Sequence, residues 1–170
     1  RLYDCTGTLF DGLDFLKFKY GIRIDSAYYC CKFNDVLCLQ CDCGFMATGS
    51  GNQAIFNWCQ FSACNTGFFN RNIGSGVTLN ACYIQNNDTG IDVSFGGIFV
   101  IDRCYFEKNR NYIVDVVDSD SAKGILVFKN SMININGTNL SSNKAAIRQT
   151  LSSGKSLSLV LGENSIINEY

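Results

Sequence analysis

One short phrase recurs three times in the middle of the chain, and it constrains the fold more than any other feature. Each copy has an apolar residue, two linking residues, a cysteine, a residue of exposed type and a second apolar residue, and the cysteines are 23 and then 22 residues apart. Strands this short cannot bury a face alone, so a period of about 20 to 25 residues is typical of a solenoid with one repeat per turn. The copies are Phe56-Asn57-Trp58-Cys59-Gln60-Phe61, Leu79-Asn80-Ala81-Cys82-Tyr83-Ile84 and Ile101-Asp102-Arg103-Cys104-Tyr105-Phe106.

We therefore predict an all-β fold, a single-stranded right-handed parallel β-helix of about six coils. Side chains alternate along a strand, so the cysteine and the second residue after it face inward and the residues between and beyond them face outward. Glycines at 67 and 90 are expected to supply left-handed backbone angles at the corners. Three inner ladders are predicted: thiols or hydroxyls of Cys31, Cys59, Cys82, Cys104, Ser131 and Ser165; apolar Phe33, Phe61, Ile84 and Phe106; and a corner ladder of Cys64, Asn87 and Asn109.

The repeat divides one β-helix domain, 1–170, into three parts. Residues 1–29 fit the repeat least and are expected to form an irregular first coil, 30–124 form regular coils, and 125–170 form looser coils with longer loops. The first regular coil spans 13 residues from Cys31 to Gly44 where later coils need eight, which predicts an insertion there. Because both ends fall within patterned sequence, we expect the chain to be a segment of a longer protein.

Composition narrows the functional classes. The chain is 46% hydrophobic and 17% charged with a net charge of −1, which does not favour nucleic-acid binding. No apolar run approaches the roughly 20 residues of a membrane helix, so no membrane insertion is expected. Four of the ten cysteines, at 31, 59, 82 and 104, fall on one repeat position that continues as Ser131 and Ser165, which predicts buried free thiols and folding in a reducing compartment. No cofactor is predicted.

A metal site in Cys38-Leu39-Gln40-Cys41-Asp42-Cys43 is a weaker alternative. Thiolates at this spacing can share one metal ion, but the chain has no histidine and no second cysteine pair at matching spacing. We favour a thiol-rich turn in which Cys41 stacks on Cys64. The absence of histidine also excludes Ser-His and Cys-His triads within these residues.

Two segments, GVTLNACYIQNNDTGIDV and IFVIDRCYFEKNRNYIVDV, resemble coils of the right-handed parallel β-helix, or pectin-lyase-like, superfamily. The resemblance covers about residues 24–168. The lack of proline and the thiol core look most like a bacteriophage tailspike or capsule depolymerase. This resemblance implies a homotrimer on the virion tail, folded in the host cytoplasm, that binds and often cleaves bacterial surface polysaccharide; a secreted or cell-surface location is the alternative.

Outward positions on two adjacent coils place Tyr83 and Gln85 beside Tyr105 and Glu107. A pyranose can lie on an aromatic ring while its hydroxyls bond polar neighbours, so these residues, with Arg103, are candidates for substrate binding. Packing of the tyrosines against a neighbouring subunit or loop is the alternative.

Glycoside hydrolysis needs two carboxyl groups, about 5 Å apart for retention or about 6.5 to 9.5 Å for inversion. Asp102 and Glu107 lie on one coil, separated by a turn, whereas Asp92 and Asp115 lie near equivalent positions on successive coils. The run at 113–117 fits two registers, and a shift of one residue would reverse every face. These four acids are the catalytic candidates.

Two other functions stay open. A lyase would need calcium, which Asp115, Asp118 and Asp120 could hold, with Arg103 or Arg110 as the base. A non-catalytic adhesin, fibre or structural spacer would need no paired acids. An acid pair in an outer groove would favour the enzyme, and scattered acids would favour the spacer.

Overall fold

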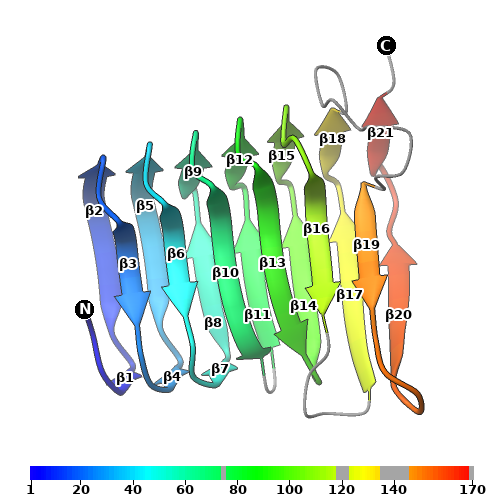
Figure 1. Cartoon of the computed structure of the whole chain (residues 1–170), viewed down its shortest axis with the longest axis horizontal. Helices are drawn as coiled ribbons and strands as arrows, with labels where there is room; N and C mark the ends of the chain where they lie inside the picture. Colours follow the sequence, from blue (N-terminus) through cyan, green and yellow to red (C-terminus); the bar gives the residue numbers. More distant parts are fainter. Residues whose placement is uncertain (74–75, 118–122, 135–145, 169–170) are drawn as a thin grey trace.

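The chain winds into a parallel β-helix whose coils stack along the long axis (Figure 1). The computed structural model describes residues 1–73, 76–117, 123–134 and 146–168. Within these ranges every regular element is a strand, and no helix is present that could cross a membrane. The all-β parallel fold predicted from the repeat is confirmed.

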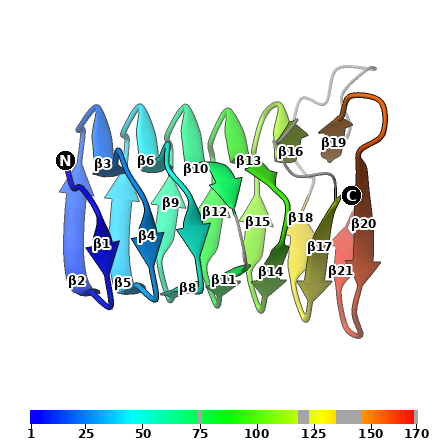
Figure 2. The same cartoon turned by 90° about the horizontal axis from the view of Figure 1, so that it is seen from below.

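Each regular coil contributes one strand to each of three faces. The strands of faces 1 and 2 belong to one hydrogen-bonded sheet, which bends at the corner between the two faces. The strands of face 3 belong to the other sheet. Figure 2 shows the coils from below, with equivalent strands of neighbouring coils aligned. Face 1 contains β8 (Ala54–Asn57), β11 (Gly76–Asn80), β14 (Ile98–Asp102), β17 (Lys123–Lys129) and β20 (Ser156–Leu161); face 2 contains β9 (Gln60–Ser62), β12 (Tyr83–Gln85), β15 (Tyr105–Glu107), β18 (Met132–Asn134) and β21 (Ile166–Asn168).

The first two coils are built differently, because β2 (Leu9–Leu16) and β5 (Lys32–Leu39) each run across faces 1 and 2 without a break. Residues 9–16 and 20–24 lie in the segment expected to be irregular, yet they continue both sheets in register. Face 3 contains β3 (Tyr20–Ile24), β6 (Cys43–Ala47), β10 (Thr66–Ile73), β13 (Thr89–Phe95), β16 (Tyr112–Val117) and β19 (Ile147–Thr150), and its sheet also includes β1 (Cys5–Thr6), β4 (Tyr28–Tyr29) and β7 (Gly51–Asn52).

The corner between faces 1 and 2 uses one left-handed residue in each coil. This residue bends the chain without interrupting the pairing of coils, and most of the side chains found there are small or polar. Gly67 and Gly90, which were predicted to supply left-handed angles, lack positive φ; a Cβ on Gly67 would instead lie 2.7 Å from the carbonyl oxygen of Gly90 on the next coil. The corner residues, with φ from 47° to 60°, are Gly12, Asp35, Trp58, Ala81, Arg103, Asn130 and Asn164.

The predicted position of Cys31 was wrong. Leu37 pairs with Gln60, so Val36 is the residue equivalent to Cys59. Phe33 lies on face 1, with its ring stacked on that of Phe56 at 4.3 Å. The strands of faces 1 and 2 both alternate inward and outward residues. Cys31 and Phe33 on face 1 therefore matched the phrase expected on face 2, five residues before its true position.

The same register shows that the insertion predicted between Cys31 and Gly44 was wrong. Cys43 pairs with Thr66, which makes Gly44 equivalent to Gly67, and Val36 and Cys59 each precede their glycine by eight residues. Cys41 lies one coil from Cys64, as predicted for a thiol-rich turn, and Asn65 N–H donates to the Cys41 carbonyl at 3.3 Å.

The rest of the thiol ladder follows the prediction. The Cys82 thiol donates to the carbonyls of Phe56, on the preceding coil, and Asn80, at 3.4 and 3.5 Å. Cys59 and Cys104 make the same pair of contacts, and so does the hydroxyl of Ser131. In these coils the position holds a small donor that satisfies carbonyls at the corner, which explains the exchange of cysteine for serine, whereas Val36 fills the same position without a donor. All ten cysteines are free.

The asparagine corner ladder is also confirmed. Asn87 Oδ1 accepts from Cys64 N–H at 2.9 Å, while Asn87 Nδ2 donates to Asn109 Oδ1 and the Phe61 carbonyl, both at 3.0 Å. Asn109 Nδ2 donates to the Ile84 carbonyl at 2.9 Å. These fully buried amides satisfy backbone groups that the bend between faces 2 and 3 would otherwise leave unpaired.

Candidate functional site

Two predicted substrate-binding residues lie side by side on face 2. Tyr83 and Tyr105 are direct register partners, and their ring centroids are 6.1 Å apart. Gln85 and Glu107 form the next outward pair. Tyr83 is 48% exposed, so at least one ring is open to a ligand. The four residues form one patch, as their spacing predicts.

Asp102 and Arg103 lie at the corner beside this patch. Asp102 Oδ1 accepts from Asn130 Nδ2 at 3.1 Å, and Arg103 Nη2 donates to Asn80 Oδ1 at 2.7 Å. Tyr105 lies between Asp102 and Glu107 along the chain and also faces outward. Asp102 and Glu107 are therefore not neighbouring carboxylates, which weakens their case as a catalytic pair.

Asp92 and Asp115 are brought together on face 3. They are register partners on β13 and β16, which resolves the ambiguous register of 113–117. Adjacent strands are about 4.8 Å apart, so the backbones of these two residues lie on neighbouring coils at the closest spacing the fold allows. The outward row along face 3 is Arg23, Met46, Phe69, Asp92, Asp115 and Arg148.

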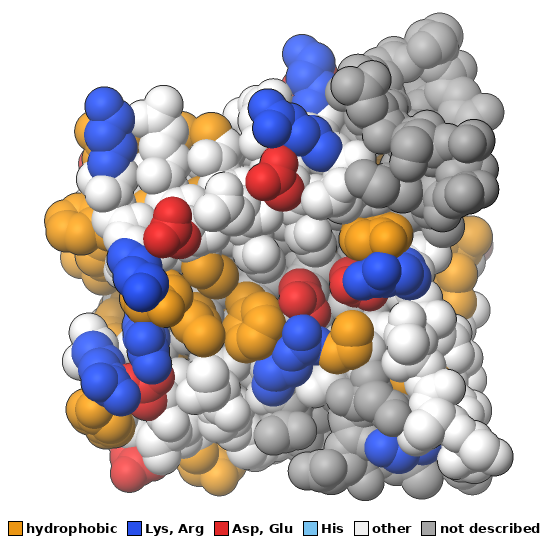
Figure 3. Space-filling view, viewed as in Figure 1, with side chains coloured by type: hydrophobic (Ala, Val, Ile, Leu, Met, Phe, Trp, Pro, Cys, Tyr) orange, Lys and Arg blue, Asp and Glu red, His pale blue; other side chains and the backbone are white. Residues whose placement is uncertain are grey.

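Each of these acids has an arginine partner. Arg71 contacts both oxygens of Asp92, with Nη1 2.9 Å from Oδ1 and Nη2 3.0 Å from Oδ2. Arg148 donates from Nε to Asp115 Oδ1 at 2.8 Å and from Nη2 to Oδ2. Its guanidinium also lies 3.9 Å from the ring centroid of Tyr112. Figure 3 shows acidic and basic side chains adjoining one another over this part of the face.

The two acids have different surroundings. Burial is the main cause that raises the pKa of Asp92; Asp115 raises it further, while Arg71 and Arg148 oppose the shift. Asp115 is only 5% exposed and is held by its arginine through both oxygens. A carboxyl whose pKa is raised by burial, beside a second carboxyl held through both oxygens by an arginine, is an arrangement suited to proton donation.

Sequence reasoning missed both arginines. Arg71 is outside the cysteine phrase, and its approach to Asp92 depends on an irregularity in the pairing of β10 with β13. Arg148 lies 33 residues after Asp115, beyond the regular period, so repeat spacing gives no signal for it.

The metal alternatives gain no support. Asp118 and Asp120 lie outside the described residues, and Asp115 is already bound to Arg148. In the described ranges no three His, Cys, Asp or Glu side chains are placed to hold a metal ion. Burial raises the pKa values of Cys38 and Cys43, which favours the protonated thiol over the metal-binding thiolate.

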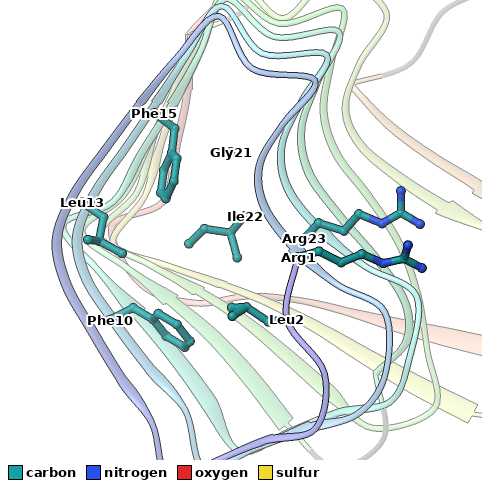
Figure 4. Close-up of a pocket in the computed structure, with 8 residues that line it drawn as sticks. All are labelled: Arg1, Leu2, Phe10, Leu13, Phe15, Gly21, Ile22 and Arg23. Carbon is teal, nitrogen blue, oxygen red and sulfur yellow. The ribbon is translucent and has the colours of Figure 1, made fainter.

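A hollow at the amino-terminal end of the stack does not belong to this site. Figure 4 shows apolar side chains of the first coil, including Phe10, Leu13 and Phe15, pointing into the interior, whereas the side chains of Arg1 and Arg23 point away. The hollow is the end of the inner ladders, and neither acid of face 3 lines it.

The three-faced coil, the inner ladders and the stacked outer rows define the class as a parallel β-solenoid. The chain belongs to the right-handed β-helix family: the model of the "Right handed beta helix region" matches residues 1–167. No curated protein and no solved structure matches the chain. The family supports a polysaccharide-related or adhesin-like role in general terms.

Proposed function

We propose that this protein recognises a bacterial surface polysaccharide and hydrolyses it at Asp92 and Asp115. The observation that carries the proposal is the in-register acid pair, in which burial and a neighbouring acid raise the pKa of Asp92. Asp92 would protonate the leaving glycosidic oxygen while Asp115 attacks the anomeric carbon, and a water molecule deprotonated by Asp92 would then hydrolyse the glycosyl–Asp115 ester and free both carboxyl groups. The backbones of the two acids are about 4.8 Å apart, so their carboxyl groups can reach the roughly 5 to 5.5 Å separation of retaining enzymes.

The two arginines would block the acids in the free protein and release them when a sugar binds. In the free protein Arg71 and Arg148 occupy both carboxyl groups. Arg71 and Arg148 side chains are 31% and 44% exposed, so each can move toward solvent when a sugar enters. The guanidinium of Arg71 also lies over the ring of Phe69, 4.7 Å from its centroid, so movement of Arg71 would uncover an apolar surface beside Asp92 for that sugar.

The test is depolymerisation of purified capsular and O-antigen polysaccharides, followed by reducing-end release. Asp92→Asn and Asp115→Asn should each lower kcat at least about 100-fold, since a positioned acid or nucleophile contributes 10²-fold or more. Asp88→Asn, an exposed acid paired with Arg110, is the matched control and should keep wild-type activity. Glu107→Gln and Asp102→Asn should also stay active. Cleavage that survives both Asp92→Asn and Asp115→Asn would refute the proposed acid pair.

A non-catalytic adhesin or spacer is the second candidate. It is favoured by the fact that both acids are already paired, so they could simply hold adjacent coils together. Glycan binding measured beside this assay, with no product release, would establish the adhesin, whereas neither binding nor cleavage would favour the spacer.

The assembly and location belong to the same proposal. We place the protein on a phage tail as a homotrimer. Support for association comes from face 1, whose outer surface is partly apolar: Ile55, Ile98, Ile125 and Val160 are between 37% and 45% exposed. Sedimentation of wild type against an Ile98→Lys/Ile125→Lys variant tests it, with a shift to smaller species expected.

A further inference from the structure

The single tryptophan of the chain occupies an unfavourable place. Trp58 is 64% exposed and lies at the left-handed corner between faces 1 and 2, with φ of 58°. A bulky residue rarely adopts this backbone conformation, whereas asparagine and glycine, which fill the corner in other coils, adopt it readily. Trp58 thus combines backbone strain with exposed apolar area. Because the fold imposes this angle in every coil, asparagine or glycine would serve the backbone better here, and the exposed indole is the feature that needs a separate explanation.

Trp58, Tyr83 and Tyr105 follow one another on three successive coils, and we call them the aromatic row. Gln60, two residues after Trp58, is the register partner of Tyr83, which in turn pairs with Tyr105. Trp58 therefore lies on the coil before Tyr83, at the corner that leads into the strand paired with it. The corner residue between them on the next coil is Ala81, whose methyl group is too short to separate the rings.

Polar groups flank the row on its face 1 side. Asn80 Nδ2 donates to Asn57 Oδ1 at 2.9 Å, and Arg103 Nη2 donates to Asn80 Oδ1 at 2.7 Å. The side chain of Arg103 is 60% exposed, which leaves further N–H groups open to solvent. Aromatic faces beside amide and guanidinium donors match a pyranose, which has an apolar face and a rim of hydroxyls.

We propose that Trp58, Tyr83 and Tyr105 form a carbohydrate-binding ridge that holds a linear polysaccharide along the solenoid axis without cleaving it. The ligand class rests on the proposed function. The ridge is separate from the acid pair, because the buried corner ladder of Asn87 and Asn109 lies between face 2 and face 3. Binding and cleavage can therefore be lost independently.

The test uses the intrinsic fluorescence of Trp58, which no other tryptophan obscures. Purified capsular and O-antigen polysaccharides are titrated into wild type and Asp92→Asn. At least one glycan should shift the emission saturably in both proteins, with Kd values that agree within twofold. If none of them changes the emission, the ridge does not exist.

Variants separate binding from folding. Trp58→Asn should weaken glycan affinity, measured by calorimetry, at least tenfold, while its Tm equals or exceeds that of wild type, because asparagine accepts the left-handed corner. Tyr83→Ala should also weaken affinity. Phe18→Ala removes an exposed ring that is outside the ridge and should leave affinity unchanged. Wild-type affinity in Trp58→Asn would overturn the proposal.

The results that would refute the ridge differ from those that would refute the acid pair. Cleavage that is unaffected by Trp58→Asn, with no emission change, would remove the ridge and leave the acid pair. A saturable emission change with no product from any glycan would leave the ridge and remove the hydrolase.

Discussion

Asp92 lies where the outer row of face 3 changes from apolar to charged residues. Met46 and Phe69 precede it in register, and Asp115 and Arg148 follow. Its raised pKa means that burial outweighs the attraction of Arg71, so the ionised carboxylate is less stable here than in water. Such a residue costs stability at neutral pH, which is typical of a group retained for chemistry.

The pH dependence of stability follows from this shift. Below the ordinary carboxyl pKa of 3.8, Asp92 is protonated in both the folded and the unfolded chain, and no penalty arises. As the pH rises through the raised folded-state pKa, the folded protein loses stability relative to the unfolded chain. Asp92→Asn lacks this titration, so its advantage over wild type should be near zero at acid pH and grow toward pH 7. Urea unfolding across this range checks it; a constant difference would contradict the raised pKa.

At the scale of the element, the inward side chains of each strand stack on the same positions of the neighbouring coils. These stacks from different faces pack against one another and form the core of the solenoid. Phenylalanine rings stack from coil to coil, Phe33 on Phe56 at 4.3 Å and Phe45 on Phe68 at 4.8 Å. The two stacks meet edge to face, with Phe45 and Phe56 4.9 Å apart. Each pair of this kind contributes about 0.5 to 1.5 kcal/mol beyond its buried area.

The inner amide ladder should be more sensitive to truncation than the outer one. Asn87→Ala leaves the buried Cys64 N–H without its acceptor and removes the second donor to the Phe61 carbonyl, and we expect a loss of about 2 to 4 kcal/mol in unfolding free energy. Asn57→Ala on the half-buried outer ladder is the matched control, where water can replace the amide and the loss should be below about 1 kcal/mol. Equal losses in urea unfolding would contradict this account.

The glycines at the start of face 3 should resist substitution for steric reasons. A Cβ on Gly67 would lie 2.7 Å from the Gly90 carbonyl, so Gly67→Ala should cost about 1 to 3 kcal/mol or more by pushing coils apart. Gly12 has φ of +60° but open space around it, and Gly12→Ala should cost about 1 to 2 kcal/mol from backbone strain alone. A difference should also appear between the variants in crystal structures: coil spacing changes only for Gly67→Ala.

At the scale of the whole molecule, the thiols lie almost entirely inside the solenoid. Nine cysteines are buried and only Cys30 is exposed. Burial raises the pKa of Cys64 to about 11, which makes its thiol a poor nucleophile at neutral pH.

Thiol titration should therefore report folding directly. In native protein at pH 8, an aromatic disulfide reagent should modify one thiol rapidly, and Cys30→Ser should abolish that phase. In concentrated urea all ten should react. Rapid reaction of several native thiols would show that the coils open more readily than the buried ladders imply.

The sequence was sufficient to predict which residues stack on one another wherever the repeat length is constant. Cys59, Cys82 and Cys104 are 22 or 23 residues apart, and the same spacing predicted the Asn87 and Asn109 ladder and the approach of Asp92 to Asp115. It failed at Cys31, because two adjacent faces have the same alternation of inward residues and only pairing with the next coil distinguishes them.

The outer surface was harder to predict than the core. Arg71 and Arg148 reach their acids across an irregular strand and a long connection, so spacing does not reveal them. The backbone angle of Trp58 is not visible in its residue type either, since the corner accepts side chains as different as alanine and arginine. The repeat length determines which residues stack in the core, whereas contacts on the outer surface also depend on the length and orientation of each side chain.

The stacking of coils also determines how the protein would respond to force. Strands lie across the axis, so the hydrogen bonds that join one coil to the next run parallel to it (Figure 1). A pull along the axis loads these bonds one after another, and each coil contacts only its neighbours. The solenoid should therefore peel from an end in steps of one coil, each releasing about 20 to 25 residues of slack chain. A fibre of this design would yield gradually under tension.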